Sequence, residues 1–370
     1  MAMAKHLGVT NAVASRVYKA TEAKEPIAVA HLMPGPEPLR RLLKSASRKG
    51  VPPEYIREAA EAVDQFDRLI REVAGDRGGL DIIIGSRLRD VRERADFISR
   101  QTVYKGMSHI RGESTETFAH THIIHPGKGD RLYDHAILSN VLGFHRLRPT
   151  QEHSAKSDEN EQDLSEIRSL DGGPIHDHND LLLPEFSSKP LPEVSINRRE
   201  RFYTIQSMSP EIGLNAAVDL AWCYVVRSTP FHGVMSMTRS PTKKSVLNVL
   251  VHRDIPVIHE PILRVYDTAG IGPVRFGDHR YTDAILDHHT RLEHFGSDTS
   301  QCGSTDIPRF AEMVRMVCFK LGWDVSAFRG YRCSIEYPMY GAQICMAFDP
   351  GEADNQGPTA QGIPLSPSIP

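Results

Sequence analysis

Residues 2–20 of this chain read AMAKHLGVTNAVASRVYKA, and the pattern predicts two short helices joined by a tight turn. Ala4 is small where two helices would cross closely. Gly8, four residues later, is able to take the positive φ that such a turn requires. Thr10 is placed to cap the following helix, because its side-chain oxygen accepts a backbone N–H. The stretch therefore predicts a helix-turn-helix.

The second helix of this pair is expected to have a polar outer face. Val13 and Val17 lie one turn apart and are expected to face the first helix. The residue types left outside are those that contact phosphates and base edges in a DNA major groove. Arg16 and Asn11 are predicted to read base edges. The full set of predicted DNA contacts is Thr10, Asn11, Ala12, Ser15, Arg16 and Lys19.

The phrase LGVT…SRV resembles bacterial helix-turn-helix transcriptional regulators, and the resemblance covers residues 2–20. It implies a regulator that binds double-stranded DNA. One inner position departs from the pattern, because Ala14 stands where Val or Ile is usual, so thin packing is expected there. A supporting helix usually precedes the motif. Either the chain has a start further upstream, or later helices supply that support. The simpler alternative is an ordinary helical hairpin packed on a core.

Charge is distributed unevenly along the 370 residues, although the net charge is only −3. Residues 1–50 carry nine Lys and Arg against three Asp and Glu, which suits binding to a polyanion. Residues 151–185 carry two against ten, which is typical of a solvated linker. The five cysteines form no CxxC pair, so free thiols in a reducing cytoplasm are expected. No apolar run approaches the ~20 residues that span a bilayer.

The expected fold class is α/β (α+β), with an all-helical head followed by a mixed α/β body. Helix and strand patterns divide the chain into five segments. They are a helix-turn-helix head at 1–74, a long helix with a small α/β unit at 75–149, an acidic, proline-containing linker at 150–194, an α+β domain at 195–348 and a disordered tail at 349–370.

Individual elements follow from apolar periodicity and from Pro and Gly breaks. Residues 26–35 are expected to be a connection. Helices are expected at 86–111, 132–142 and 305–320, and a strand at 115–125. Residues 331–337 and 342–348 are expected to pair as a hairpin.

The chain contains eighteen histidines, and their clusters favour a rival function. His120-Thr-His122 resembles the opening motif of metal-dependent amidohydrolases, and imidazole is a good ligand for zinc or iron. His125 has the opposite parity on a strand, so this segment supplies at most two ligands. The other clusters are His176-Asp177-His178 and His288-His289 with Glu293 and His294. Core or surface histidines are the preferred interpretation, and no catalytic residue, metal ligand or cofactor is assigned.

The sequence therefore predicts a cytoplasmic DNA-binding transcriptional regulator. It is expected to form a homodimer, since one motif gives little specificity and half-sites come in pairs. Its body is expected to sense an unidentified small-molecule effector or to make the dimer. The alternative function is a metal-dependent, hydrolase-like enzyme that uses the His120/His122 pair. A third possibility is an interaction module whose basic head binds an acidic partner or residues 151–185 of its own chain.

Overall fold

The computed structural model describes residues 2–85, 89–148, 167–192, 194–199, 202–207, 211–238, 240–257, 260–268, 285–286, 290–296 and 302–348. The chain forms two compact units, Met1–Ser99 and Arg100–Pro370, which we call the head and the body. Helices come first and mixed sheets and helices follow, so the predicted α+β class is confirmed. The first part of the predicted linker, up to residue 166, and the predicted tail lie outside the described residues.

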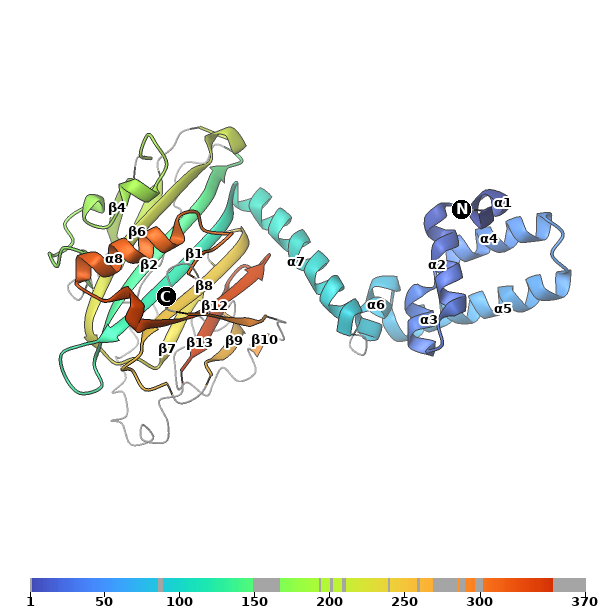
Figure 1. Ribbon diagram of the computed structural model, residues 1–370. Coiled ribbons are helices and arrows are strands. Elements are labelled where there is room, and N and C mark those ends of the chain that lie inside the picture. Colours follow the sequence, from blue (N-terminus) through green and yellow to red (C-terminus); the bar gives the residue numbers. More distant parts are fainter. Residues whose placement is uncertain are drawn as a thin grey trace, which may run out of the picture. The chain divides into compact units, whose positions relative to one another are not determined.

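The head is built from short helices (Figure 1). They are α1 (Ala2–Leu7), α2 (Asn11–Glu22), α3 (Pro26–Leu32), α4 (Pro36–Arg48), α5 (Pro53–Leu69), the π-helix η1 (Ile70–Ala74) and α6 (Arg77–Gly85). Helices α3, α4 and α5 each begin at a proline, whose fixed φ and missing N–H suit a first helical turn. The expected connection at 26–35 is therefore wrong, because α3 occupies most of it.

Helices α4 and α5 pack together through apolar and ionic contacts. Each contributes a buried side chain, Leu39 and Val63 respectively. Arg40 of α4 reaches Asp64 and Asp67 of α5 at 3.0 and 2.8 Å. The neighbouring guanidinium lowers the pKa of Asp67. Arg40 thus joins the two helices.

Helix α6 returns along η1 at very close range. A Cβ added at Gly79 would lie 2.2 Å from the carbonyl oxygen of Ala74, so only glycine fits there. Ile70, Leu80 and Ile84 form the buried cluster of this turn. Two glycines near its start disfavour a helix, so α6 is not predicted from the sequence.

Helix α7 (Arg89–Arg111) confirms the helix predicted at 86–111 over the residues that are described. Its 23 residues correspond to about 35 Å of helix. The C-terminal half belongs to the body. There, Arg100 donates to the carbonyl oxygen of Glu336 at 2.7 Å, and Gln101 donates to the hydroxyl of Tyr337 at 3.2 Å.

The body is centred on a seven-stranded sheet with the order β11-β12-β8-β1-β2-β6-β3. Only the β1–β8 pair is parallel among the described pairings of this sheet. Its strands are β1 (Glu113–Pro126), β2 (Tyr133–Arg146), β3 (Ile167–Arg168), β6 (Val218–Thr229), β8 (Thr242–His252), β11 (Leu292–Phe295) and β12 (Phe328–Glu336).

A four-stranded sheet and a separate strand pair complete the described strands. The four-stranded sheet has the order β10-β9-β13-β7, built from β10 (Ile285–Leu286), β9 (Ile262–Asp267), β13 (Ala342–Ala347) and β7 (Gly233–Met237). β4 (Val194–Arg199) pairs with β5 (Phe202–Ser207). Short 3-10 turns lie at His178–Asp180, Pro184–Phe186, Leu214–Ala216 and Val325–Ala327.

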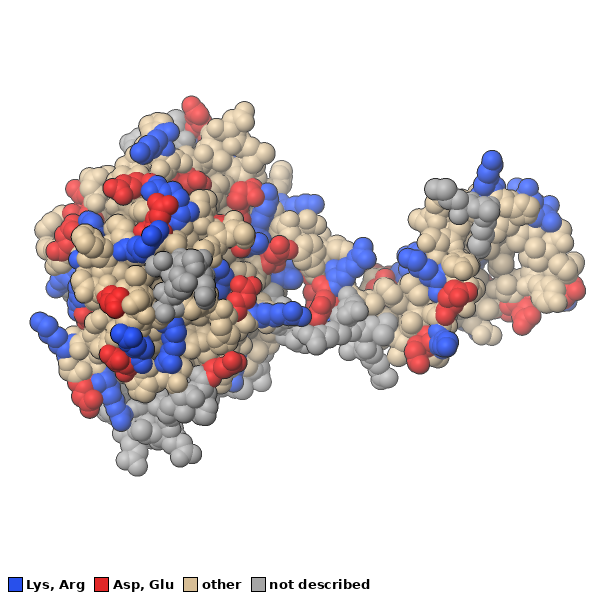
Figure 2. Space-filling model, in the orientation of Figure 1, with Lys and Arg blue, Asp and Glu red and all other residues tan. Residues whose placement is uncertain are grey.

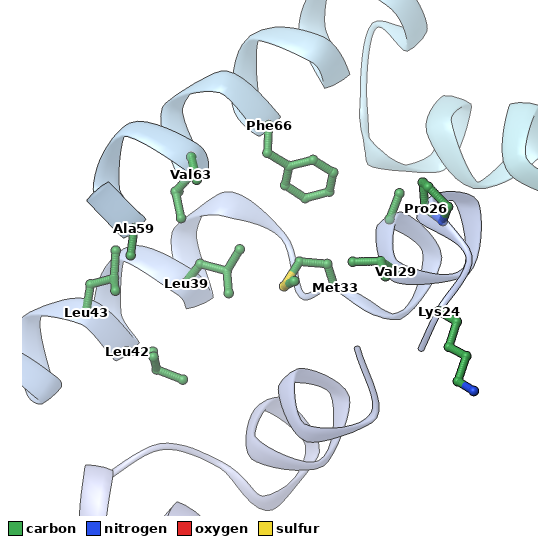
Figure 3. Close-up of a pocket in the computed structure, with 12 residues that line it drawn as sticks. Lys24, Pro26, Val29, Met33, Leu39, Leu42, Leu43, Ala59, Val63 and Phe66 are labelled. Carbon is green, nitrogen blue, oxygen red and sulfur yellow. The ribbon is translucent and has the colours of Figure 1, made fainter. Parts of the chain in front are cut away.

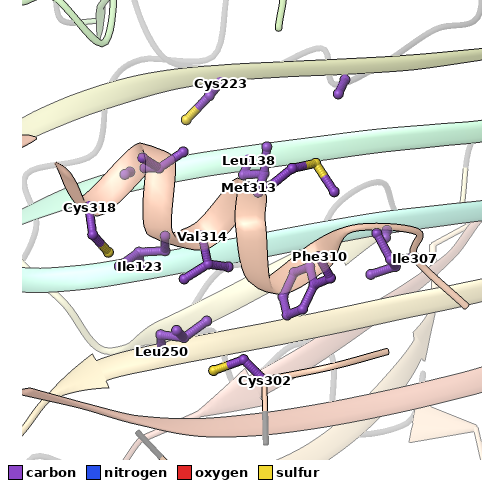
Figure 4. Close-up of a cluster of buried hydrophobic side chains, with 14 of the residues drawn as sticks. Ile123, Leu138, Cys223, Leu250, Cys302, Ile307, Phe310, Met313, Val314 and Cys318 are labelled. Atoms are coloured by element: carbon purple, nitrogen blue, oxygen red, sulfur yellow. The ribbon is translucent and has the colours of Figure 1, made fainter. Parts of the chain in front are cut away.

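Helix α8 (Phe310–Leu321) covers one face of the large sheet (Figure 4). Its buried side includes Phe310, Val314 and Val317. The helix expected at 305–320 is confirmed from residue 310 onward. These side chains share a core with Ile123 and Leu250 of the sheet. Ile124, Leu247 and Val249 belong instead to the core that includes Val265 and Ile344 of the small sheet.

Two predicted elements of the body are wrong. Residues 132–142 form most of strand β2 and not a helix. The predicted hairpin of 331–337 and 342–348 does not exist, because β12 pairs with β8 and β11 while β13 pairs with β7 and β9. Strands β1 and β2 also share a sheet with β8 and β12, so the predicted division between 75–149 and 195–348 does not match the compact units.

Candidate nucleic-acid interface

The turn between α1 and α2 has the geometry that the sequence predicts. Gly8 has a φ of +61°, in the left-handed region that favours glycine. The backbone N–H of Val9 donates to the carbonyl oxygen of Ala4 at 3.1 Å, which closes the end of α1. Ser45 of α4 donates a further hydrogen bond to the carbonyl oxygen of Leu7 at 2.5 Å. A later helix thus supports the short α1.

Helix α2 begins with the predicted cap. The hydroxyl oxygen of Thr10 accepts from the backbone N–H of Val13 at 3.3 Å. The buried residues of α2 are Ala14 and Ala20, and Ala4 of α1 is buried as well. Val13 and Val17 are only partly buried. Helix α2 therefore packs on the rest of the head through small side chains, as expected from the alanine at position 14.

Most predicted contact residues are accessible to a ligand. Thr10, Asn11, Ala12, Ser15, Arg16 and Lys19 are all exposed. Successive polar positions Asn11, Ser15 and Lys19 lie four residues apart, so they form one stripe along α2. The stripe carries amide, hydroxyl and ammonium groups, which can hydrogen-bond to base edges and phosphates in a DNA groove.

Arg16, predicted to read base edges, contacts the end of helix α3 in the structure. Its Nε donates to the carbonyl oxygen of Leu32 at 3.0 Å, and its Nη2 donates to those of His31 and Met33 at 2.9 and 3.2 Å. These are the last carbonyls of α3, which lack partners within the helix. A guanidinium at the C-terminal end of a helix is also favoured by the helix dipole. Arg16 thus fixes α2 to α3.

Charge in the head is divided between its edges. Figure 2 shows Lys and Arg along the edge that carries α1 and α4, and Asp and Glu along the edge that carries α5. The exposed basic residues along the edge of α1 and α4 include Lys5, Arg41, Lys44, Arg48 and Lys49. The exposed acids of α5 include Glu54, Glu58 and Glu61. On the face shown, basic side chains therefore gather at the edge of α1 and α4, where they favour an anionic partner.

The rival histidine pair lies inside the body. His120 and His122 are 3% and 4% exposed, and they share the sheet face of His135 from β2. His122 Nδ1 and His135 Nε2 are 2.6 Å apart, a hydrogen-bonding distance. Two nitrogens on a tetrahedral zinc ion would be about 3.3 Å apart. Burial lowers the pKa of His122, and it lowers the pKa of His135 to about 3. These lowered pKa values favour the neutral form of both rings.

His135 is the member of this cluster that the sequence does not reveal. It follows His122 by thirteen residues, and only the β1–β2 register brings them together. Within the described residues, no group of three or more His, Cys, Asp and Glu side chains is arranged to hold a metal ion. Of the second predicted cluster, Asp177 and Asp180 form a capping box around a 3-10 turn. His288 and His289 lie outside the described residues.

The five cysteines are free and buried. Burial raises the pKa of Cys318, Cys333 and Cys345 to about 12 each. A thiol with so high a pKa is protonated at neutral pH and is a poor nucleophile. These three cysteines are buried residues of the body.

Comparison with known proteins finds no protein-family model that matches this chain and no match among curated proteins. In the described part of the chain, no helix combines the length and the apolar character needed to cross a membrane.

Proposed function

We propose that this protein is a DNA-binding transcriptional regulator that inserts α2 into the major groove. The observation that supports this most is the α1–α2 unit. Gly8 makes the sharp turn, Thr10 caps the second helix, and the exposed stripe of Asn11, Ser15 and Lys19 follows directly. A helix that is seated through small side chains and exposes polar groups is suited to direct readout.

The roles within α2 divide between reading and positioning. Asn11 and Ser15 are the candidates for base contacts, because an amide and a hydroxyl can hydrogen-bond to base edges. Lys19 is the candidate for a phosphate contact. Arg16 keeps α2 at a fixed angle to α3, so it is a positioning residue in this proposal. Thr10 combines its capping role with access to phosphate, and Ala12 offers apolar contact to a thymine methyl.

The basic edge of the head supports the same function. Lys44 and Arg48 of α4 are exposed on the helix that also contacts the end of α1 through Ser45. Basic side chains at this position would bind phosphates beside the groove that α2 enters. Because the acidic side chains of α5 lie on another edge, they would not repel the DNA.

A second copy of the chain completes the proposal, because paired half-sites need a dimer. Val103 and Ile110 lie seven residues apart on one side of α7 and are 48% and 62% exposed. Tyr104 and Arg111, one position further, face the body through Tyr337 and Tyr340. The side of α7 with Val103 and Ile110 is therefore the proposed dimer contact. The variant Val103→Glu/Ile110→Glu should be monomeric by light scattering while the wild type is dimeric.

The test of DNA binding is selection from a random duplex library at ~150 mM salt, where non-specific phosphate binding is weakened. Enrichment of one short palindromic motif is expected. The variant Asn11→Ala/Ser15→Ala should lose the enrichment and keep its melting temperature. Glu58→Ala, on the acidic helix α5, is the matched control and should behave as wild type. If the wild type enriches nothing, the regulator proposal is wrong.

A further inference from the structure

The head contains a pocket that the DNA-binding proposal does not use. It has a volume of about 530 Å³ and lies among α3, α4 and α5 (Figure 3). Its walls include Val29 of α3, Met33 directly after α3, Leu42 of α4 and Phe66 of α5. Pockets that bind small molecules typically measure about 300–1,000 Å³ and have mostly apolar walls with a few polar groups.

The apolar walls of the pocket are incompletely covered by the protein. Leu39 and Val63 are buried, whereas Met33, Leu42 and Phe66 are only partly buried. Protein interiors are normally packed as densely as organic crystals, and side chains that face a gap lose dispersion contacts. An apolar molecule that filled the space would restore those contacts and remove the exposed apolar area from water.

Lys24 is the one charged side chain among the described residues of the lining. It follows α2 directly, is exposed, and stands at the edge of the cluster in Figure 3. No ion pair joins it to any carboxylate of the described chain. An ammonium group at the rim of an apolar pocket selects for a ligand with a negative group at one end, because the contact between them is a charge-assisted hydrogen bond.

We propose that this pocket binds an amphipathic carboxylate, with its apolar chain among α3, α4 and α5 and its carboxylate at Lys24. The site is in the helical head and not in the body, where the sequence predicts an effector. The regulatory part of this inference rests on the proposed DNA-binding function, but binding of the carboxylate does not.

The pocket is connected to α2 through a short path. The side chain of Met33 lines the pocket, and its carbonyl oxygen accepts a hydrogen bond from Arg16 of α2. A ligand that pushed on Met33 would therefore change the end of α3 to which Arg16 is fixed. The orientation of the proposed reading helix would respond to occupancy of the pocket.

The first test is direct calorimetric titration of the full chain with decanoate below its micelle concentration. Saturable one-to-one binding is expected. Shortening the probe by one CH2 should weaken binding about fourfold. The neutral amide of decanoate should bind about tenfold more weakly, because it lacks the charge that Lys24 recognises. Absence of saturable binding would overturn the proposal.

Variants locate the bound probe. Ala59→Phe places a ring in the pocket and should abolish binding, whereas Ala60→Phe, on the same helix but outside the lining, should not. Lys24→Gln should remove the preference for decanoate over its amide, whereas Lys49→Gln should keep it. Circular dichroism at 222 nm establishes that each variant is folded. Equal binding by wild type and a folded Ala59→Phe variant would show that decanoate binds elsewhere, and the proposal would fail.

The second test measures the affinity for the selected DNA duplex with and without saturating decanoate. A change of threefold or more is expected in wild type and none in Ala59→Phe. Binding of decanoate with no change in DNA affinity would overturn the regulatory part alone. Binding of decanoate by a protein that selects no DNA would refute the proposed function and leave the ligand site standing.

Discussion

The guanidinium groups of Arg16 and Arg77 meet at the carbonyl oxygen of His31, to which each donates at 2.9 Å. Arg16 comes from α2 and Arg77 from α6, so the end of α3 joins two helices that are far apart in the sequence. Arg77 also donates to the carbonyl oxygen of Ala30 at 3.0 Å, and its guanidinium lies 5.6 Å from the ring centroid of Phe66. Partial burial and the nearby Arg16 lower the pKa of Arg77 below its usual value, while Asp81 opposes that change.

Replacing Arg16 by alanine is expected to loosen the head as well as to impair DNA binding. The variant loses hydrogen bonds to three carbonyl oxygens, and a charged hydrogen bond at an exposed site contributes about 1 kcal/mol. Hydrogen exchange of the α2 and α3 amides should accelerate severalfold, while the body amides are unchanged. Lys19→Ala is the control, since Lys19 makes no comparable contact among the described residues. Wild-type protection in Arg16→Ala would show that this contact does not hold the helices.

Lys19→Ala should weaken binding to all DNA sequences about equally. A phosphate contact carries no sequence information, and its loss should reduce the slope of log K against log salt by about 0.9. Fluorescence anisotropy at several salt concentrations measures both quantities. A variant that lost discrimination between the selected motif and a scrambled duplex would place Lys19 on a base edge instead.

Gly79→Ala should be far more damaging than Gly8→Ala. At Gly8 the positive φ is the only obstacle, since nothing lies within 4 Å of an added Cβ, and the expected loss is about 1 kcal/mol. At Gly79 the new methyl group would meet the carbonyl oxygen of Ala74, so η1 and α6 would have to separate. Thermal melting at 222 nm should show a small shift for Gly8→Ala and a loss of helix for Gly79→Ala. Similar shifts in the two variants would contradict the close packing of α6.

The body should lose stability as the pH falls below about 6.5. His122 and His135 have lowered pKa values in the folded state, so the unfolded chain binds protons that the folded chain does not. Above about pH 6.5, the pKa of histidine in the unfolded chain, the two histidines do not reduce the free energy of unfolding. Below that pH, the free energy of unfolding declines by up to about 1.4 kcal/mol per pH unit for each histidine, and for His135 the decline ends near pH 3.

Tryptophan fluorescence can report this effect, because both tryptophans, Trp222 and Trp323, belong to the body. The midpoint of urea unfolding should fall between pH 7.5 and pH 5. The fall should be smaller in His135→Gln, which cannot take up the proton. An unchanged midpoint in wild type would mean that the two rings are protonated as readily in the folded chain as in the unfolded one.

The local features of the head are predictable because short-range rules govern them. The turn at Gly8 and the cap at Thr10 depend on residues within one helical turn, and both are found. The role of Arg16 is not predictable, since it depends on where α3 ends. Helix α3 itself is missed because a seven-residue helix gives little periodic signal.

The errors in the body come from long-range pairing. Strand β2 is buried on both faces from Ala136 to Val141, so its apolar run lacks the alternation that identifies a strand. Alternation in β12 and β13 does indicate strands, but their partners lie elsewhere in the sequence. The contact of His122 with His135 likewise requires the register of β1 against β2.

The parallel pairing of β1 with β8 bears on how the chain is made. Thr115 of β1 pairs with Thr242 of β8. The central strand β1 is therefore synthesised more than a hundred residues before the strand with which it pairs. Contacts of such long range slow folding, because the intervening loop must be closed first. The head, in contrast, is a compact unit that ends at Ser99. On the ribosome, the head should therefore be folded while one edge of β1 is still open to solvent.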